Sequence, residues 1–121
     1  MKRILVADDD PASAELLTYF LRAHGFEVET APDGNRAAEL GTSGDYALVI
    51  LDFHMPVYDG DEVLELVRKR HLLHPVKVIA LTADESADVR DALEAGKVDS
   101  FLTKPVDLAR LRQEIDRLLA A

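Results

Sequence analysis

The segment Ala47-Leu48-Val49-Ile50-Leu51-Asp52, followed by Phe53-His54-Met55-Pro56-Val57-Tyr58-Asp59-Gly60, decides the fold of this chain. Five consecutive apolar residues are typical of a strand that is buried on both faces, as in a parallel sheet covered by helices. The strand ends on the carboxylate of Asp52, and the turn after it contains Pro56, Asp59 and Gly60, which bend the backbone away. Open α/β sheets bind their ligands at the carboxyl ends of their strands, so we predict that Asp52 is the reactive residue.

Four further short segments, one of them with alternating apolar and polar residues, predict the other strands of the sheet. They cover Lys2 to Ala7, Phe26 to Thr30, Lys77 to Leu81 and Ser100 to Thr103. The predicted helices between and after them are one that begins at Pro11, a weaker one over Arg36 to Leu40, Glu62 to Arg70, Glu85 to Ala95, and one that begins at Leu108. Five strands that alternate with five helices over residues 1–121 predict a single α/β domain, doubly wound around a parallel sheet.

Capping residues and apolar faces define the first and last of these helices. Asp10 and Asp107 stand directly before them, and aspartate is a favoured N-cap. We expect Gly25 to end the first helix, and residues 41–44 to be a loop that leads to the Asp52 strand. Apolar faces at helical spacing are predicted for the first helix (Leu16, Leu17, Phe20 and Leu21) and for the last (Leu108, Leu111, Ile115, Leu118 and Leu119).

The composition excludes several classes of protein. The chain has 121 residues, 48% of them hydrophobic, and no cysteine, which excludes disulfides, thiolate zinc sites and thiol catalysis. No apolar run reaches the ~20 residues of a membrane span and no signal peptide is evident, so we expect a cytoplasmic protein without membrane contact. The net charge of −9 argues against direct nucleic-acid binding, because the phosphate backbone would repel the chain.

Polar residues stand at four of the five predicted strand ends. Asp8 with Asp9, Asp52, Thr82 and Lys104 each follow an apolar segment. Since parallel strands present their carboxyl ends at one edge of the sheet, we expect these side chains to converge there. Three close carboxylates repel one another unless a cation is present, and a set of hard oxygen ligands suits Mg²⁺.

This set of side chains predicts phosphoryl-transfer chemistry. An aspartate carboxylate can act as a covalent nucleophile, which makes Asp52 the expected phosphoryl acceptor. The transfer mainly requires positioning and charge stabilisation, which Mg²⁺ on one side and the Lys104 ammonium on the other would supply. Thr82 would offer a hydroxyl donor at the next strand end.

In combination, Asp8-Asp9, the segment from Asp52 to Gly60, Thr82-Ala83 and Lys104-Pro105 resemble the signature of response-regulator receiver domains of two-component signalling, including the chemotaxis receivers. The resemblance covers essentially the whole chain, with the motifs in the family's order and spacing. It implies a flavodoxin-like doubly wound (βα)5 fold with a five-stranded parallel sheet. It also implies a protein that is not an enzyme, apart from catalysing its own phosphorylation and dephosphorylation.

The resemblance implies a role for each residue that takes part in phosphorylation. Asp52 would take a phosphoryl group from the phosphohistidine of a histidine kinase or phosphotransfer protein. Asp9, Asp52 and the backbone carbonyl of His54 would bind Mg²⁺, and Asp8 would assist through water. Lys104 would contact the phosphoryl group.

The resemblance also implies a switch. Thr82 would move to bond the phosphate, Phe101 would occupy the position of the switch aromatic residue, and the Lys104-Pro105 peptide bond would be cis. The face from about Glu85 to Leu119 would be the output surface for an output domain or a downstream protein. A homodimer through the last helices is a further arrangement that the resemblance allows.

Two other functions fit the same fold. A Mg²⁺-dependent phosphohydrolase would require a second acid close to the nucleophile, as in Asp-x-Asp, but the corresponding position is His54. A phosphorylation-independent interaction module would have no need of the intact set of Asp9, Asp52, Thr82 and Lys104. Turnover of a generic phosphate ester would identify the first alternative, and absence of Mg²⁺ binding would favour the second.

Overall fold

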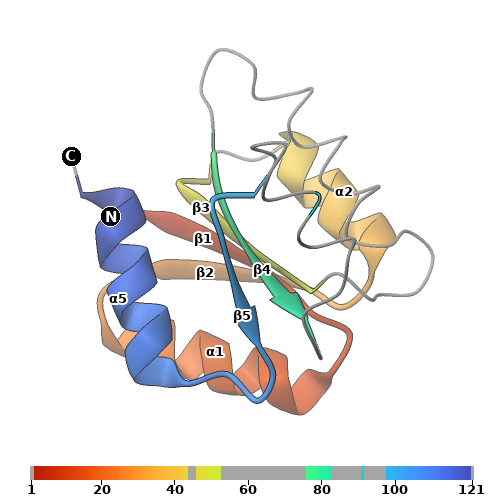
Figure 1. Ribbon diagram of the computed structural model, residues 1–121. Helices are drawn as coiled ribbons and strands as arrows, with labels where there is room; N and C mark the ends of the chain where they lie inside the picture. The colour runs from red at the N-terminus through yellow and green to blue at the C-terminus, as the bar shows by residue number, and fades with distance from the viewer. Residues whose placement is uncertain (1, 44–45, 53–75, 83–90, 92–97, 121) are drawn as a thin grey trace.

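A parallel sheet organises the structure and brings its strand ends to one edge (Figure 1). The computed structural model describes residues 2–43, 46–52, 76–82, 91 and 98–120. The strands are β1 (Arg3–Ala7), β2 (Glu27–Ala31), β3 (Leu48–Asp52), β4 (Lys77–Thr82) and β5 (Ser100–Thr103). They lie in the order β2-β1-β3-β4-β5, and every neighbouring pair is parallel. The predicted five-stranded parallel sheet is therefore confirmed.

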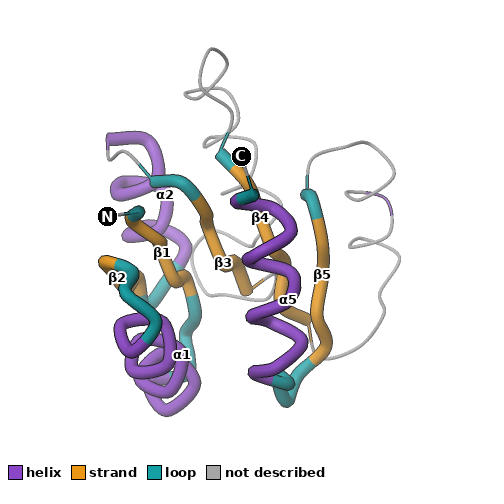
Figure 2. The backbone as a smooth tube through the Cα atoms, turned by 90° about the vertical axis from the view of Figure 1, so that its left-hand side faces the viewer, coloured by secondary structure: helices purple, strands orange, loops and turns teal. Residues whose placement is uncertain are grey.

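Helices cover both faces of this sheet. The described helices are α1 (Pro11–Ala23), α2 (Gly34–Ser43) and α5 (Leu108–Leu119). Helices α1 and α5 lie on one face and α2 lies on the other (Figures 1 and 2). The helices predicted over residues 62–70 and 85–95 lie outside the described residues, apart from Asp91. None of the described helices is long and apolar enough to cross a bilayer.

The central strands are buried on both faces, as the run of apolar residues before Asp52 predicts. No residue of β3 is more than 4% exposed. Side chains alternate along each strand, so Ile4 and Ile50 pack with α1 and α5, whereas Leu5 and Val49 pack on the side of α2. The sheet thus separates two apolar layers, and its carboxyl edge carries the polar residues.

The helix boundaries follow from local hydrogen bonds. The Asp10 carboxylate accepts from the Ala12 N–H at 3.1 Å, and the Asp107 carboxylate accepts from two N–H groups in the first turn of α5, so both predicted N-caps are confirmed. Gly25, with φ at +89°, ends α1 as predicted. The N–H groups of Gly25 and Phe26 donate to carbonyls in the last turn, which is the Schellman arrangement.

Two predictions about the helices need correction. Leu16 is 53% exposed, because the sheet covers only the narrow stripe of α1 that carries the buried Leu17 and Leu21. Residues 41–43, expected in a loop, form the last turn of α2. Glycine, threonine and serine are weak helix formers, but packing of the buried Ala37 and the partly buried Leu40 against the sheet stabilises the helix.

Candidate functional site

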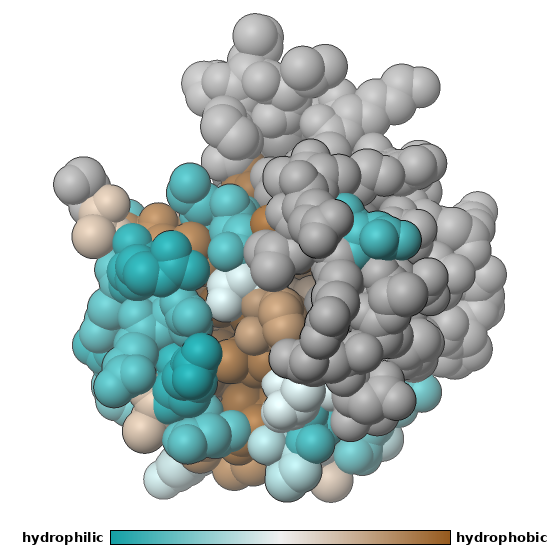
Figure 3. All heavy atoms as spheres, viewed as in Figure 1, coloured by the Kyte–Doolittle hydropathy of each residue, from teal (hydrophilic) through white to brown (hydrophobic). Residues whose placement is uncertain are grey.

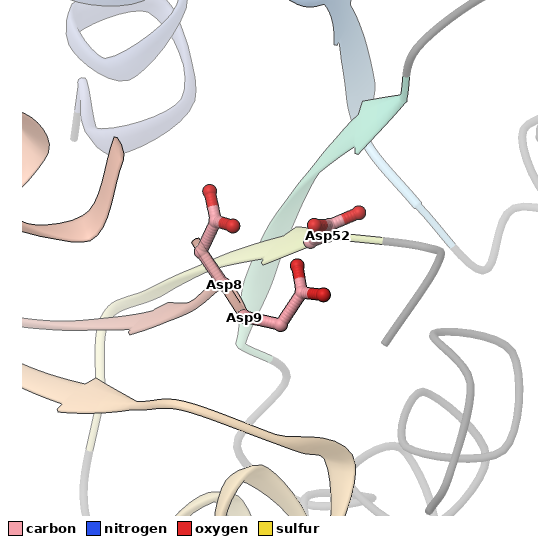
Figure 4. Close-up of side chains that lie close together, drawn as sticks. All are labelled: Asp8, Asp9 and Asp52. Carbon is pink, nitrogen blue, oxygen red and sulfur yellow. The ribbon is translucent and has the colours of Figure 1, made fainter. Parts of the chain in front are cut away.

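The carboxylates of Asp8, Asp9 and Asp52 gather where β1 and β3 end (Figure 4). Ala7 pairs with Leu51 in the sheet, so Asp8, which follows β1, lies beside Asp52, the last residue of β3. The chain winds outward in opposite directions from β1 and β3, to β2 on one side and β4 on the other. Ligands of open α/β sheets bind at this kind of topological switch point.

The three carboxylates are close enough to share one cation. Each offers an oxygen, and these oxygens lie within 4.8 Å of one another. Opposite ligands of an octahedral Mg²⁺ with bonds of about 2.1 Å are ~4 Å apart, so small side-chain movements bring this set into range. Asp8 and Asp52 are buried, at 1% and 4% exposure, whereas Asp9 is exposed. The cluster is therefore open to solvent on the Asp9 side.

Lys104 bridges two of these carboxylates. Its Nζ donates to Asp52 Oδ2 at 3.1 Å and to Asp8 Oδ1 at 3.2 Å. Its backbone N–H donates to the Thr82 carbonyl at 2.8 Å, which fixes the end of β5 against β4. The Lys104-Pro105 bond is cis, as expected.

The protonation of Lys104 reflects this environment. Burial acts to lower the pKa of Lys104, but the hydrogen bonds and charges of Asp52 and Asp8 outweigh burial and raise this pKa above its ordinary value. The ammonium therefore remains charged at neutral pH. Three carboxylates and one ammonium leave two negative charges at the site, which a divalent cation would balance.

Asp8 accepts hydrogen bonds on both of its oxygens. Its Oδ1 accepts from the Asp10 N–H at 3.0 Å as well as from Lys104, and its Oδ2 accepts from the Ser13 hydroxyl at 2.8 Å. The orientation of this buried carboxylate is thus fixed by groups from α1, from the segment before it and from the end of β5.

Thr82 and Phe101 lie on neighbouring strands near the site. Thr82 is fully buried at the end of β4, and Phe101 is half-buried on β5, packed against the apolar layer on the side of α2. Phe101 pairs with Ala80, so alternation along β4 directs Thr82 to the same face of the sheet as Phe101.

The sequence predicted that Asp8, Asp9, Asp52, Thr82 and Lys104 converge. The convergence of the side chains of Asp8, Asp9, Asp52 and Lys104 is confirmed. Thr82 lies at the adjacent strand end, where its carbonyl accepts from the Lys104 N–H. His54, the other predicted Mg²⁺ ligand, lies outside the described residues. The sequence did not reveal Ser13. Its contact with Asp8 spans five residues across a strand end and a helix start, where no periodicity indicates proximity.

Comparison with known proteins identifies the family. Residues 4–116 match the response regulator receiver domain. The chain belongs to this family. Receiver domains of two-component response regulators are phosphoacceptors and generally not classical enzymes, so the receiver-domain assignment and the fold expected from the sequence are confirmed.

This receiver domain is similar to the amino-acid sequences of several transcriptional regulators. It is 40% identical to TcrA of Mycobacterium tuberculosis, over 91% of this chain and 44% of that protein. It is 42% identical to PrrA of Mycobacterium bovis, over 97% of this chain and 49% of that protein. The chain therefore spans about half the length of these relatives.

Solved structures agree with this assignment. The response regulator TrrA of Thermotoga maritima, determined in complex with Mg(2+)-BeF, is 39% identical, with a TM-score of 0.84 over 98% of this chain and 100% of that one. The chemotaxis protein CheY4 of Vibrio cholerae is 28% identical, with a TM-score of 0.89 over 98% of this chain and 99% of that one. This chain thus shares its fold with a response regulator and with a chemotaxis protein.

Proposed function

We propose that this receiver domain takes a phosphoryl group onto Asp52 and uses it to switch an output surface. The observation that carries the proposal is the contact of the Lys104 ammonium with Asp52 beside the carboxylates of Asp8 and Asp9. A cation is thereby held next to the one acid that ends the central buried strand. We further propose that residues 1–121 form one such domain.

The transfer is a direct displacement at phosphorus. A carboxylate oxygen of Asp52 forms a bond to phosphorus while the bond from phosphorus to the donor breaks, and the donor leaves with the electron pair of that bond. Lys104 neutralises the phosphoryl oxygens that come to lie beside Asp52, and its distance of 3.1 Å from Oδ2 supports this role. In dephosphorylation, water attacks phosphorus, the Asp52 carboxylate leaves, and the proton of the water passes to the released phosphate.

Mg²⁺ is the metal that these residues would hold. Asp9 and Asp52 are the proposed direct ligands with the backbone carbonyl of His54, while Asp8, whose oxygens already accept three hydrogen bonds, would act through water. When bound, Mg²⁺ supplies charge neutralisation and orients phosphoryl oxygens. The Mg(2+)-BeF complex of the similar TrrA supports this choice of metal.

Thr82 and Phe101 are the proposed switch residues. Both side chains belong to the same face of adjacent strands, so a movement of the Thr82 hydroxyl toward a phosphate on Asp52 would open space beside Phe101. A phosphate adds ~1.5–2 negative charges at neutral pH, which is the local event that biases the two arrangements.

The proposed partners are a histidine kinase or phosphotransfer protein as the donor, and an output domain or downstream protein as the receiver of the signal. The output surface that we propose includes β5 and α5. The outward surface of α5 is hydrophilic (Figure 3), and its exposed residues include Arg110, Gln113, Asp116 and Arg117. Such a surface favours a polar, reversible contact over a permanent apolar one.

Intact mass after incubation with acetyl phosphate tests the proposal. We expect one phosphoryl group on the wild-type chain, dependent on Mg²⁺ and labile in base, and none on Asp52→Asn. Asp10→Asn is the matched control, because asparagine is an equally good N-cap and this variant should be phosphorylated normally. Equal labelling of Asp52→Asn would contradict the assignment, and absence of both labelling and Mg²⁺ binding in wild type would favour a phosphorylation-independent interaction module.

A further inference from the structure

Ser13 contacts the acid cluster but takes no part in the transfer described above. It is the third residue of α1 and is half-buried. Its hydroxyl donates to Asp8 Oδ2 at 2.8 Å, the shortest of the three hydrogen bonds that Asp8 accepts. A serine near the start of a helix often caps that helix, but here Asp10 caps α1 and the hydroxyl of Ser13 is directed to another side chain.

The contact determines how Asp8 faces Lys104. The Asp8 side chain has no solvent exposure, so loss of the Ser13 hydroxyl would leave a buried carboxylate oxygen with one hydrogen bond fewer. Ser13 holds Oδ2, and this leaves Oδ1 toward the Lys104 ammonium at 3.2 Å. In Figure 4 the carboxylates of Asp8 and Asp9 leave the end of β1 in different directions, consistent with separate tasks for the two acids.

We propose that Ser13 is a positioning residue for phosphoryl transfer. It holds Asp8 so that Asp8 and Asp52 together keep the Lys104 ammonium where the phosphoryl group arrives. A lysine has a long, flexible stem, so its ammonium needs two fixed acceptors to remain at one point. The proposal rests on the proposed function of Asp52 as the phosphoryl acceptor.

Two matched pairs of variants test this role. Ser13→Ala removes the hydroxyl, and Ser13→Thr keeps it. Ser13→Val has the shape of Ser13→Thr without the hydroxyl, so this second pair remains informative if the smaller side chain disturbs the helix. Thr18→Ala is the control, because the Thr18 hydroxyl donates to the Ala14 carbonyl of the same helix at 2.7 Å and does not contact the acid cluster.

The first readout is the side-chain ammonium signal of Lys104 in ¹⁵N NMR, assigned by its loss in Lys104→Met. We expect a resolved signal in wild type, Ser13→Thr and Thr18→Ala, and a signal that is shifted or lost to solvent exchange in Ser13→Ala and Ser13→Val. The second readout is phosphorylation by acetyl phosphate in saturating Mg²⁺. The maximal rate should fall about tenfold without the hydroxyl, while the donor concentration for half-maximal rate stays unchanged.

A Lys104 signal and a maximal rate that are the same in Ser13→Val and Ser13→Thr would overturn the proposal. If wild type accepts no phosphoryl group, the proposed function of Asp52 fails, and the NMR comparison still decides the role of Ser13. An unchanged Lys104 signal would then refute the positioning of Lys104 by Ser13. A changed signal would support that positioning, without a role in phosphoryl transfer.

Discussion

Lys104 is the residue on which the charge balance of the site depends. Its ammonium is the cation that contacts two buried carboxylates in the described part of the chain. Because the pKa of Lys104 is raised from 10.5, the stabilisation that it contributes is fully present below about pH 10.5 and is lost as the pH rises through the higher folded-state value. At neutral pH the lysine therefore contributes fully to folding.

We predict that Lys104→Met lowers the free energy of unfolding by about 3 kcal/mol in a buffer with EDTA, because two buried carboxylates lose their counter-charge. Mg²⁺ should recover more of the stability of this variant than it adds to wild type, since it replaces the missing cation. Urea unfolding followed by circular dichroism measures both effects.

Lys2→Met is the control for this prediction, because its ammonium is exposed and contacts the Leu119 carbonyl far from the site. We expect it to change stability by less than about 0.5 kcal/mol. Equal stability of Lys104→Met and wild type in EDTA would show that the bridge between Asp8 and Asp52 does not support the fold.

At the scale of elements, α5 packs on the sheet through its buried Leu111 and Ile115 and carries an ion pair between its own residues Glu114 and Arg117. Arg117 Nε donates to the Glu114 carboxylate at 2.7 Å. This hydrogen bond lowers the pKa of Glu114 below its ordinary value of 4.5, and a hydrogen bond with the Ser100 side chain lowers it further. Burial acts in the opposite direction but is outweighed. Because the pKa of Glu114 is lower in the folded state than in the unfolded state, its charged carboxylate stabilises the fold at pH values above the unfolded-state pKa. This stabilisation is lost as the pH falls through the folded-state pKa.

We predict that Glu114→Gln costs about 1 kcal/mol at pH 7, limited by the exposure of Arg117, and that the difference from wild type disappears as the pH falls through the lowered folded-state pKa of Glu114. Urea unfolding at a series of pH values measures it. A double-mutant cycle with Arg117→Gln isolates the pair. A cost that does not change between pH 7 and the most acidic pH at which the protein is still folded would show that the charge of Glu114 is not involved.

Element boundaries were predictable where a residue has a specific backbone requirement. Asp10 and Asp107 cap their helices and Gly25 ends α1, because each satisfies hydrogen bonds that the chain cannot satisfy otherwise. The end of α2 was not predictable, because packing against the sheet overrides the weak helix propensity of residues 41–43.

At the scale of the molecule, the parallel sheet explains why sequence alone predicted that the acids and Lys104 converge. Four of the five strand ends contribute polar residues to a common edge, so residues that are far apart in the sequence lie close together there. The distances between side chains at this edge depend on their rotamers and on contacts from residues such as Ser13, which belongs to no repeating sequence pattern. The convergence of residues was therefore predictable, while the hydrogen bonds that orient them were not.

We expect metal binding to raise the free energy of unfolding of the whole domain. We predict that Mg²⁺ at 100 times its dissociation constant raises the free energy of unfolding by about 2.7 kcal/mol, because the folded carboxylates bind it and the unfolded chain does not. This rise in the free energy of unfolding should be absent in Asp9→Asn and retained in Asp10→Asn. Thermal unfolding with and without Mg²⁺ measures the rise in each variant. An equal rise in both variants would place the metal elsewhere.

Identification of the modified residue tests the central claim most directly. Borohydride reduces an aspartyl phosphate to homoserine, so peptide mass spectrometry of the reduced, phosphorylated protein reports which aspartate carried the phosphoryl group. We predict homoserine at position 52 alone, and only when phosphodonor and Mg²⁺ are both present. Homoserine at position 8 or 9, or labelled protein without homoserine at position 52, would contradict the assignment of Asp52 as the phosphoryl acceptor.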